Sequence, residues 1–238
     1  MFDILRRYTV FMSIGKYVSV KKGSFLLYCT LILFLSLPQG VHSLTSFKII
    51  QSNLIRDYNG IFHIVGEVLN KSDKAMKEIV VSATVYNNEG NQIRVFKNLI
   101  PVRILNDGKS SPFDILLLEN DRIGKISNYT LGITGTPAKS KQSALSVTAV
   151  NSRPDILGFY YINGQILNGG LESSSNSLVI ASFYDDEGKI LAVSSAITEP
   201  ANVSSRSHAS FGIVMNDKSQ VPKIGNYSLI IDSDQYIS

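Results

Sequence analysis

The sequence predicts an all-β protein in which two tandem antiparallel β-sandwich domains follow an N-terminal signal helix. Three observations predict this fold: an apolar leader, an internal repeat, and a series of short β-branched runs separated by turn residues. The apolar fraction of 44% with 18% charged residues is typical of a globular chain rather than a disordered one. A chain of 238 residues has room for two such domains.

The first 43 residues have the layout of a signal peptide. Its parts are a basic stretch that ends with Lys21 and Lys22, a mainly apolar run over 25–37 and a short segment over 38–43. The apolar run of 13 residues is shorter than the roughly 20 residues that cross a bilayer as a helix. Because Val41 and Ser43 have the modest size found before cleavage sites, we expect cleavage after Ser43.

Two alternatives to cleavage remain open. Translation can start at Met12 instead of Met1, or the segment can stay uncut as a membrane anchor with its basic end inside. Each alternative places the rest of the chain on the outer side of the membrane. We therefore expect an extracellular or cell-surface location.

Charge and cysteine usage also change at the leader. Five of the 23 basic residues and one of the 19 acidic residues precede residue 44, so 18 of each follow it. The part after the leader lacks the basic excess that nucleic-acid binding usually needs, and we expect no nucleic-acid partner. The single cysteine, Cys29, lies in the apolar run, so a chain that starts at Leu44 contains neither a disulfide nor a reactive thiol.

An internal repeat organises the rest of the chain. Residues 60–133 match residues 158–231 without a gap, at an offset of 98 residues and with 19 of 74 positions identical. Over 135–143, Pro, Lys, Ser and Gly replace the apolar pattern. We therefore expect three parts: a signal peptide or uncleaved anchor over 1–43, a first β-sandwich domain over 44–137 and a second over 138–238.

Each copy has the pattern of about seven short strands. In the first copy the β-branched and apolar runs lie at 47–51, 61–69, 79–86, 93–96, 98–105, 113–118 and 129–133. The turn residues at 87–90 predict a hairpin, which recurs at 185–188. Two antiparallel sheets that cover each other's apolar faces are the simplest closure for this number of strands.

Both copies carry two short motifs at matching places. The first is Gly-x-Val-x-Asn or a close variant, at 66–70 and 164–168, and the second is a strand that ends in a Tyr-Asp pair before an acidic turn with Gly. Together they resemble the FxLYD family of immunoglobulin-like extracellular domains. The second copy retains Tyr184 and Asp185 but departs from the family's leading Phe, and the first has Asn87 in place of the Asp. The resemblance implies immunoglobulin-like sandwiches on an exported bacterial or archaeal protein, with no catalytic residues to carry over.

Four Asn-x-Ser/Thr sequons are candidate N-glycosylation sites in an exported chain, and they begin at Asn70, Asn128, Asn202 and Asn226. Asn128 and Asn226 occupy equivalent positions in the two copies. An Asn that ends a turn before a strand explains that recurrence equally well.

A run of three aromatic residues, Phe159, Tyr160 and Tyr161, is the candidate ligand contact. Because side chains alternate between the faces of a strand, at least one ring must face away from the core. A sugar or a protein is the kind of partner that such a ring contacts. The tyrosines that recur in both copies, at 86 and 184 and at 129 and 227, are instead expected to pack in the cores with their hydroxyls bonded near the surface.

The remaining polar candidates have ordinary structural explanations. The oxygen-rich turns at 87–90 and 185–188 contain residues that bind calcium, but tight turns select the same residues and the spacing does not match an EF-hand loop. His63 and His208 are the two histidines after the leader, and neither is repeated in the other copy. No Gly-x-Ser-x-Gly elbow marks a nucleophile. We expect no metal, no cofactor and no enzymatic activity.

These observations predict a non-enzymatic exported or cell-surface protein that acts as an adhesion, spacer or ligand-binding module. The alternative is an accessory subunit or the carbohydrate-binding part of an extracellular hydrolase. The partner stays open: a cell-envelope protein or a glycan is expected, and membrane contact is expected only through an uncut N-terminal segment.

Overall fold

The computed structural model describes residues 46–118 and 126–234. Apart from one 3-10 turn at Val221–Lys223 the elements are all strands, which confirms the predicted fold class, and residues 43–238 form one compact unit. The expected signal helix and its cleavage site lie outside the described residues. Within those described ranges, no helix has the length and apolar character needed to cross a membrane.

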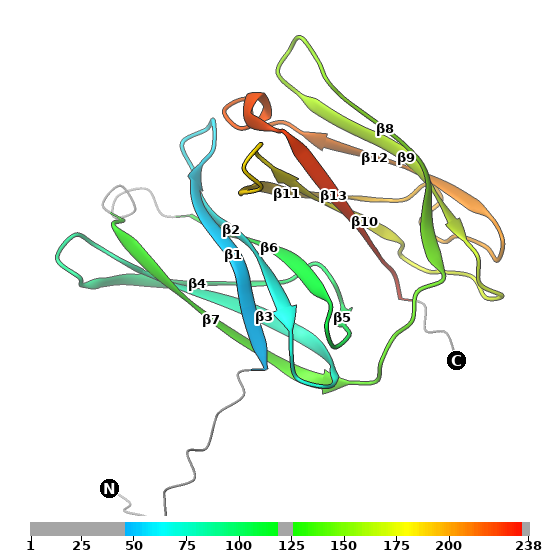
Figure 1. Ribbon diagram of the computed structural model, residues 1–238, viewed down its shortest axis with the longest axis horizontal. Coiled ribbons are helices and arrows are strands. Elements are labelled where there is room, and N and C mark those ends of the chain that lie inside the picture. Colours follow the sequence, from blue (N-terminus) through cyan, green and yellow to red (C-terminus); the bar gives the residue numbers. More distant parts are fainter. Residues whose placement is uncertain (1–45, 119–125, 235–238) are drawn as a thin grey trace, which may run out of the picture. The chain divides into compact units, whose positions relative to one another are not determined.

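The first repeat is a sandwich of two antiparallel sheets (Figure 1). One sheet has the order β1-β2-β6, with β1 at Phe47–Arg56, β2 at Phe62–Asn70 and β6 at Ser110–Leu117. The other is centred on β3 (Ala75–Tyr86), which pairs with β4 (Gln92–Leu99), β5 (Ile104–Leu105) and β7 (Asn128–Ala138).

The second repeat has the same plan, with sheet orders β12-β9-β8 and β11-β10-β13. Its strands are β8 at Leu145–Pro154, β9 at Tyr160–Asn168, β10 at Leu178–Tyr184, β11 at Ile190–Ile197, β12 at His208–Met215 and β13 at Asn226–Asp232. Five equivalent pairs, among them β1 with β8 and β7 with β13, begin 98 residues apart. The structural repeat therefore includes β1 and β8, which begin before the segments that match in sequence.

Each sandwich has its own apolar core between its two sheets. Alternating side chains of β2, β3 and β6 contribute to the first core, and those of β9, β10 and β12 to the second. Phe113 and Ile115 of the first repeat are buried, as are their equivalents Phe211 and Ile213. The apolar positions that recur in the sequence are therefore core positions in both copies.

A close approach between backbone and ring explains the repeated glycine. A Cβ atom on Gly66 would lie 2.5 Å from the Gln51 carbonyl oxygen and 2.5 Å from Cζ of Phe113. At Gly164 the ring of Phe211 takes the same place, with Cζ 2.6 Å from such a Cβ. In both repeats the neighbouring first strand has a register shift beside the glycine. The glycine is needed because the phenyl ring fills the space that a side chain would occupy.

The asparagine that ends the same motif is a buried structural residue in both repeats. The side-chain amide of Asn70 donates hydrogen bonds to the carbonyl oxygens of Lys74, at 2.7 Å, and Leu105, at 2.8 Å. Asn168 makes the two equivalent bonds at 2.8 and 2.9 Å. Both asparagines have no exposed surface, so these bonds satisfy amides that water does not reach.

The strand expected over 98–105 is wrong in its extent. Strand β4 ends at Leu99, and only the two residues of β5 pair again with β3. Pro101 lies in the interruption and has no N–H to donate to a ladder, which is why the pairing stops there.

The prediction that the four recurring tyrosines pack in the cores is correct for two of them and wrong for the other two. Tyr129 and Tyr227 pack against the two cores, but Tyr86 and Tyr184 lie on the outer faces of their sheets. Because Val85 is buried in the core and side chains alternate along β3, Tyr86 must point outward. The same alternation applies in β10.

Sheet β11-β10-β13 is covered on both faces. On one face Val179, Ala181 and Phe183 belong to the core of the second repeat. On the other face Ile180 belongs to the core cluster of the first repeat, and Leu178 packs against that cluster. Strands β1, β2 and β6 contact β11. An apolar interface, and not only a linker, therefore joins the two sandwiches.

Gly66→Ala is expected to lower the free energy of unfolding by about 1–3 kcal/mol, because the added methyl group must displace the Phe113 ring or the β1 backbone. Urea unfolding measures the change. Gly212→Ala is the control, because the nearest atom to its new methyl group is the flexible side-chain end of Asn163, at 3.1 Å. Equal unfolding midpoints for the two variants would contradict the role given to Gly66.

Candidate functional site

A buried carboxylate joins three distant segments at the interface between the repeats. Asp232, at the end of β13, is 4% exposed and accepts hydrogen bonds from Lys141 Nζ at 2.9 Å and Arg103 NH1 at 3.1 Å. The backbone N–H of Arg103 also donates to it, at 3.0 Å. Lys141 comes from the linker between β7 and β8, and Arg103 from the loop before β5. The pairing holds the last strand, the linker and the first repeat in one arrangement.

Sequence analysis missed this junction. The available signal was a single charge in an otherwise uncharged strand, because β13 reads Asn-Tyr-Ser-Leu-Ile-Ile-Asp. The first repeat has Thr134 at the position equivalent to Asp232. A charge that only one repeat carries indicates a contact that only one repeat makes.

A second set of polar contacts lies between β1 and β2 of the first repeat and β10 and β11 of the second. The hydroxyl of Tyr184 donates to Glu67 Oε1 at 2.8 Å, and Gln51 Nε2 donates to Oε2 of the same carboxylate at 2.9 Å. The Gln51 side chain also accepts from the Ile190 N–H at 3.0 Å, and Asn53 donates to the Ile190 carbonyl at 3.0 Å. Burial raises the pKa of the Tyr184 phenol, which keeps its hydroxyl protonated as a donor.

His63 lies among three carboxylates beside a small cavity between the repeats. Its Nδ1 is 3.0 Å from Asp114 Oδ1, and its Nε2 is 3.8 Å from Asp57 Oδ2. Asp217, from the second repeat, lines the same cavity of about 130 Å³. The hydrogen bond with Asp114 raises the pKa of His63 above its ordinary value of 6.5; burial opposes the rise, and the charges of the three carboxylates add to it. The three carboxylates therefore favour the protonated form of the imidazole.

The His63 group includes a direct contact between the repeats. Within the described residues no hydroxyl is hydrogen-bonded to His63, and His208 lies exposed on β12 of the other sandwich. Asp217 accepts a hydrogen bond from the Tyr58 N–H at 3.1 Å, which is a direct link between the repeats. Within residues 46–118 and 126–234, no set of three or more His, Cys, Asp or Glu side chains is placed to hold a metal ion.

Two larger cavities have aliphatic side chains in their walls, and polar side chains also line the larger of the two. One, of about 610 Å³, lies beside the Lys141–Asp232 pair and is lined by residues that include Ile104 and Ile230. The other, of about 300 Å³, lies where β3 bulges next to the loop that follows β4.

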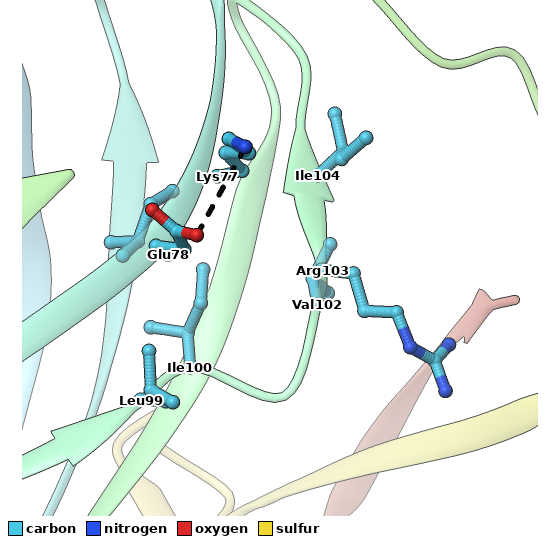
Figure 2. Close-up of a pocket in the computed structure, with 8 residues that line it drawn as sticks. Lys77, Glu78, Leu99, Ile100, Val102, Arg103 and Ile104 are labelled. Carbon is cyan, nitrogen blue, oxygen red and sulfur yellow. Dashed lines mark ion pairs between the residues drawn. The ribbon is translucent and has the colours of Figure 1, made fainter. Parts of the chain in front are cut away.

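Figure 2 shows the aliphatic side chains around the second cavity, with the Lys77–Glu78 ion pair, at 4.0 Å, beside them. Arg103 points away from these side chains, and it bonds to Asp232. Glu78 accepts a hydrogen bond from Thr136 at 3.0 Å. Because its charged residues bond within the chain, this cavity offers a ligand an aliphatic surface.

The candidate ligand-contact residues divide between the two sides of β9. The ring of Tyr160 packs edge-on against Phe183 in the core, at 5.9 Å between centroids. Phe159 and Tyr161 lie on the opposite side, with centroids 6.3 Å apart, and Lys218 Nζ lies 5.4 Å from the Phe159 centroid. Two of the three rings thus face away from the core, as strand alternation requires. Their role as a ligand contact stays a prediction.

The four sequons differ in exposure. Asn70 is fully buried and both of its amide bonds are internal, so the folded chain has no room for a glycan there. Asn128, Asn202 and Asn226 are exposed, and their glycosylation stays a prediction. The side-chain oxygens of Asn128 and Asn226 each accept the next backbone N–H at 2.8 Å, which is the local structural role offered as the alternative explanation.

The two oxygen-rich turns are the hairpins that the sequence predicts. Asn87 and Asp185 each accept two backbone N–H bonds through one side-chain oxygen, at distances between 2.8 and 3.1 Å. Gly90 and Gly188 close the turns with φ of 79° and 80°, a conformation that favours glycine. One side-chain oxygen of Asn87 and one of Asp185 are therefore used within the turns.

No protein-family model and no curated protein sequence matches the chain. Among solved structures it is similar to red sea bream transglutaminase, at 10% identity and a TM-score of 0.26, over 80% of this chain and 29% of that one. It is also similar to the Amycolatopsis orientalis exo-chitosanase CsxA, at 11% identity and a TM-score of 0.28, over 76% of this chain and 25% of that one. The chain thus spans less than a third of either protein. At these values the likeness carries no information about what this chain does.

Asp232→Asn is expected to lower the free energy of unfolding by about 3–5 kcal/mol, because it removes the buried negative charge that Lys141 and Arg103 both contact. Urea unfolding again provides the measurement. Asp234→Asn is the matched control: this carboxylate pairs with the same arginine at 2.8 Å but is 41% exposed, so its loss should cost less than about 1 kcal/mol. Similar costs for the two variants would contradict the importance of the buried pair.

Stability is expected to fall as the pH rises through the folded-state pKa of His63. That pKa is raised, so the folded state binds the proton more tightly, and this contribution is complete below 6.5 and lost above the folded pKa. Unfolding free energies between about pH 5 and about pH 9 measure the slope. His63→Gln should flatten it, whereas His208→Gln, at an exposed position, should not. An unchanged slope in His63→Gln would show that other groups cause it.

Proposed function

We propose that this chain is a non-enzymatic exported or cell-surface protein that acts as an adhesion, spacer or ligand-binding module. The observation that carries the proposal is the interface between the repeats, where sheet β11-β10-β13 is buried on both faces. Two sandwiches joined in this way hold their outer surfaces at fixed positions. That property suits a spacer or a binding module.

The export part of the proposal is supported by the sequence. The basic stretch and the 13-residue apolar run have the order of a signal peptide, and the part after them lacks cysteine. The resemblance to FxLYD domains, which are extracellular, supports the same location.

A second candidate function is the carbohydrate-binding part or accessory subunit of an extracellular hydrolase. The outward pair of Phe159 and Tyr161 favours it, because an aromatic ring offers a flat apolar surface that can stack on a sugar. Both functions place the important contacts on the outer faces of the sandwiches.

Intact mass and N-terminal sequencing of the native protein, recovered separately from the secreted, membrane and cytoplasmic fractions, test the proposal. We expect either a chain that starts at Leu44 in the secreted fraction or an uncut leader in the membrane fraction. Recovery of the uncut chain from the cytoplasm would contradict the proposed location. The same mass measurement reports glycans at Asn128, Asn202 and Asn226.

A further inference from the structure

The outer face of sheet β12-β9-β8 is the counterpart of a face that is covered in the first repeat. On β9 the outward residues Tyr161 and Gln165 are equivalent to His63 and Glu67, which contact or approach the second repeat. Gln165 is exposed in the second repeat, where no other sandwich of the described chain covers the face. The outer face of sheet β1-β2-β6 is therefore covered by the second repeat, whereas the equivalent face of the second repeat is open.

The residues of this open face do not suit a second copy of the chain. Val65 on the covered face is fully buried, and Ile180 on the sheet that covers it is 1% exposed. Asn163, on the open face of β9, is equivalent to Val65. Ser82, on the outer face of β3 in the first repeat, is equivalent to Ile180. Stacking another copy by the same contacts would bury an amide and a hydroxyl where the internal interface buries two aliphatic side chains.

The open face carries positive charge beside its aromatic pair. Arg153 on β8 lies directly opposite Tyr161 in the sheet register, and Lys218 lies over the Phe159 ring at 5.4 Å. The outward positions of the three strands contain no carboxylate. One carboxylate, that of Asp155, lies beside the aromatic pair. It accepts hydrogen bonds from the backbone N–H groups of Phe159 and Leu157, 2.9 Å each, and from the side chain of Tyr161, and these bonds lower its pKa and hold the loop. Because Arg153 and Lys218 outnumber this one internally bonded carboxylate, charge complementarity favours an anionic partner.

The other side chains of the face match the hydroxyl groups of a sugar chain. Asn151, Asn163 and Gln165 are exposed amides on adjacent strands, and each has both donors and an acceptor. The Tyr161 ring offers a flat apolar surface, while an arginine donates paired hydrogen bonds to a carboxylate. Rings, amides and a guanidinium on one flat surface are the combination that an acidic sugar residue requires.

We propose that this face binds an acidic polysaccharide, with the Tyr161 ring stacking on a sugar ring and Arg153 and Lys218, the latter held over the Phe159 ring, contacting carboxylates. The inference rests on the proposed function, since it names the ligand class of an extracellular binding module. Strand pairing holds Tyr161 and Arg153 on this surface, and the loop that contains Lys218 brings its ammonium group beside them.

Isothermal titration of the purified chain with polygalacturonate tests the inference, with dextran as the neutral polysaccharide and poly-glutamate as the anionic polymer without sugar. We expect polygalacturonate to bind and the other two to bind at least about tenfold more weakly. Tyr161→Ala and Arg153→Ala should each raise the Kd for polygalacturonate about tenfold or more. Tyr58→Ala, at a 59% exposed tyrosine on the first repeat, and Lys97→Ala, on exposed β4, should leave it unchanged.

Several outcomes overturn the inference. Equal affinity for poly-glutamate means that charge alone is recognised, as by an acidic protein segment, and equal affinity for dextran means a neutral glycan. Self-association that Tyr161→Ala abolishes would assign the face to a second copy.

Two controls accompany these measurements. The unfolding midpoints of all variants must match that of the parent chain, and Tyr161→Phe, which keeps the ring, must retain binding. Failure to bind any polymer removes this ligand but leaves the proposed function, which fails separately if the chain is cytoplasmic.

Discussion

Burial of strand β10 on both faces is the constraint on which the rest of the structure depends. Residues 179–183 are all buried, with alternate side chains in the core of the second repeat and at the interface with the first. A strand in this position can carry few polar groups, and β10 reads Val-Ile-Ala-Ser-Phe over these residues. Separating the repeats would expose an apolar sheet face to water. The two sandwiches therefore depend on each other for the burial of that sheet.

Polar groups at the interface define how the sheets lie on one another. A buried ion pair contributes little net stability, since both charges lose water, but a misplaced arrangement leaves a charge without its partner. Asp232 with Lys141 acts in this way, and Glu67 likewise loses the hydrogen bond from the neutral Tyr184 hydroxyl if the sheets are misplaced. The two free outer faces carry Asn163 and Ser82 at the positions of buried Val65 and Ile180. This difference disfavours repetition of the same interface with a further copy of the chain.

Local chemistry made much of the fold predictable. The turn glycines and the β-branched runs follow from local conformational preferences, and both copies repeat them. Gly66 and Gly164 also recur, but the reason for them is a contact with a phenyl ring from a neighbouring strand, which the sequence does not show. Interface residues such as Asp232 were not predictable because they are not repeated and depend on how one sandwich sits on the other. The recurrence of Tyr86 and Tyr184 suggested core packing. Recurrence shows only that two residues occupy equivalent places in their sheets, and it does not determine which face of the sheet they lie on. For the candidate site, strand alternation predicted outward rings, but Arg153 and Lys218 join them only through strand pairing and a loop.

If the two repeats fold as one unit, differential scanning calorimetry of the chain without residues 1–43 should show it. We expect a single transition whose calorimetric enthalpy equals the van't Hoff enthalpy, because neither repeat keeps its buried faces without the other. Two separate transitions, each with the enthalpy of about half the chain, would contradict it and would make the sandwiches independent domains joined by a linker.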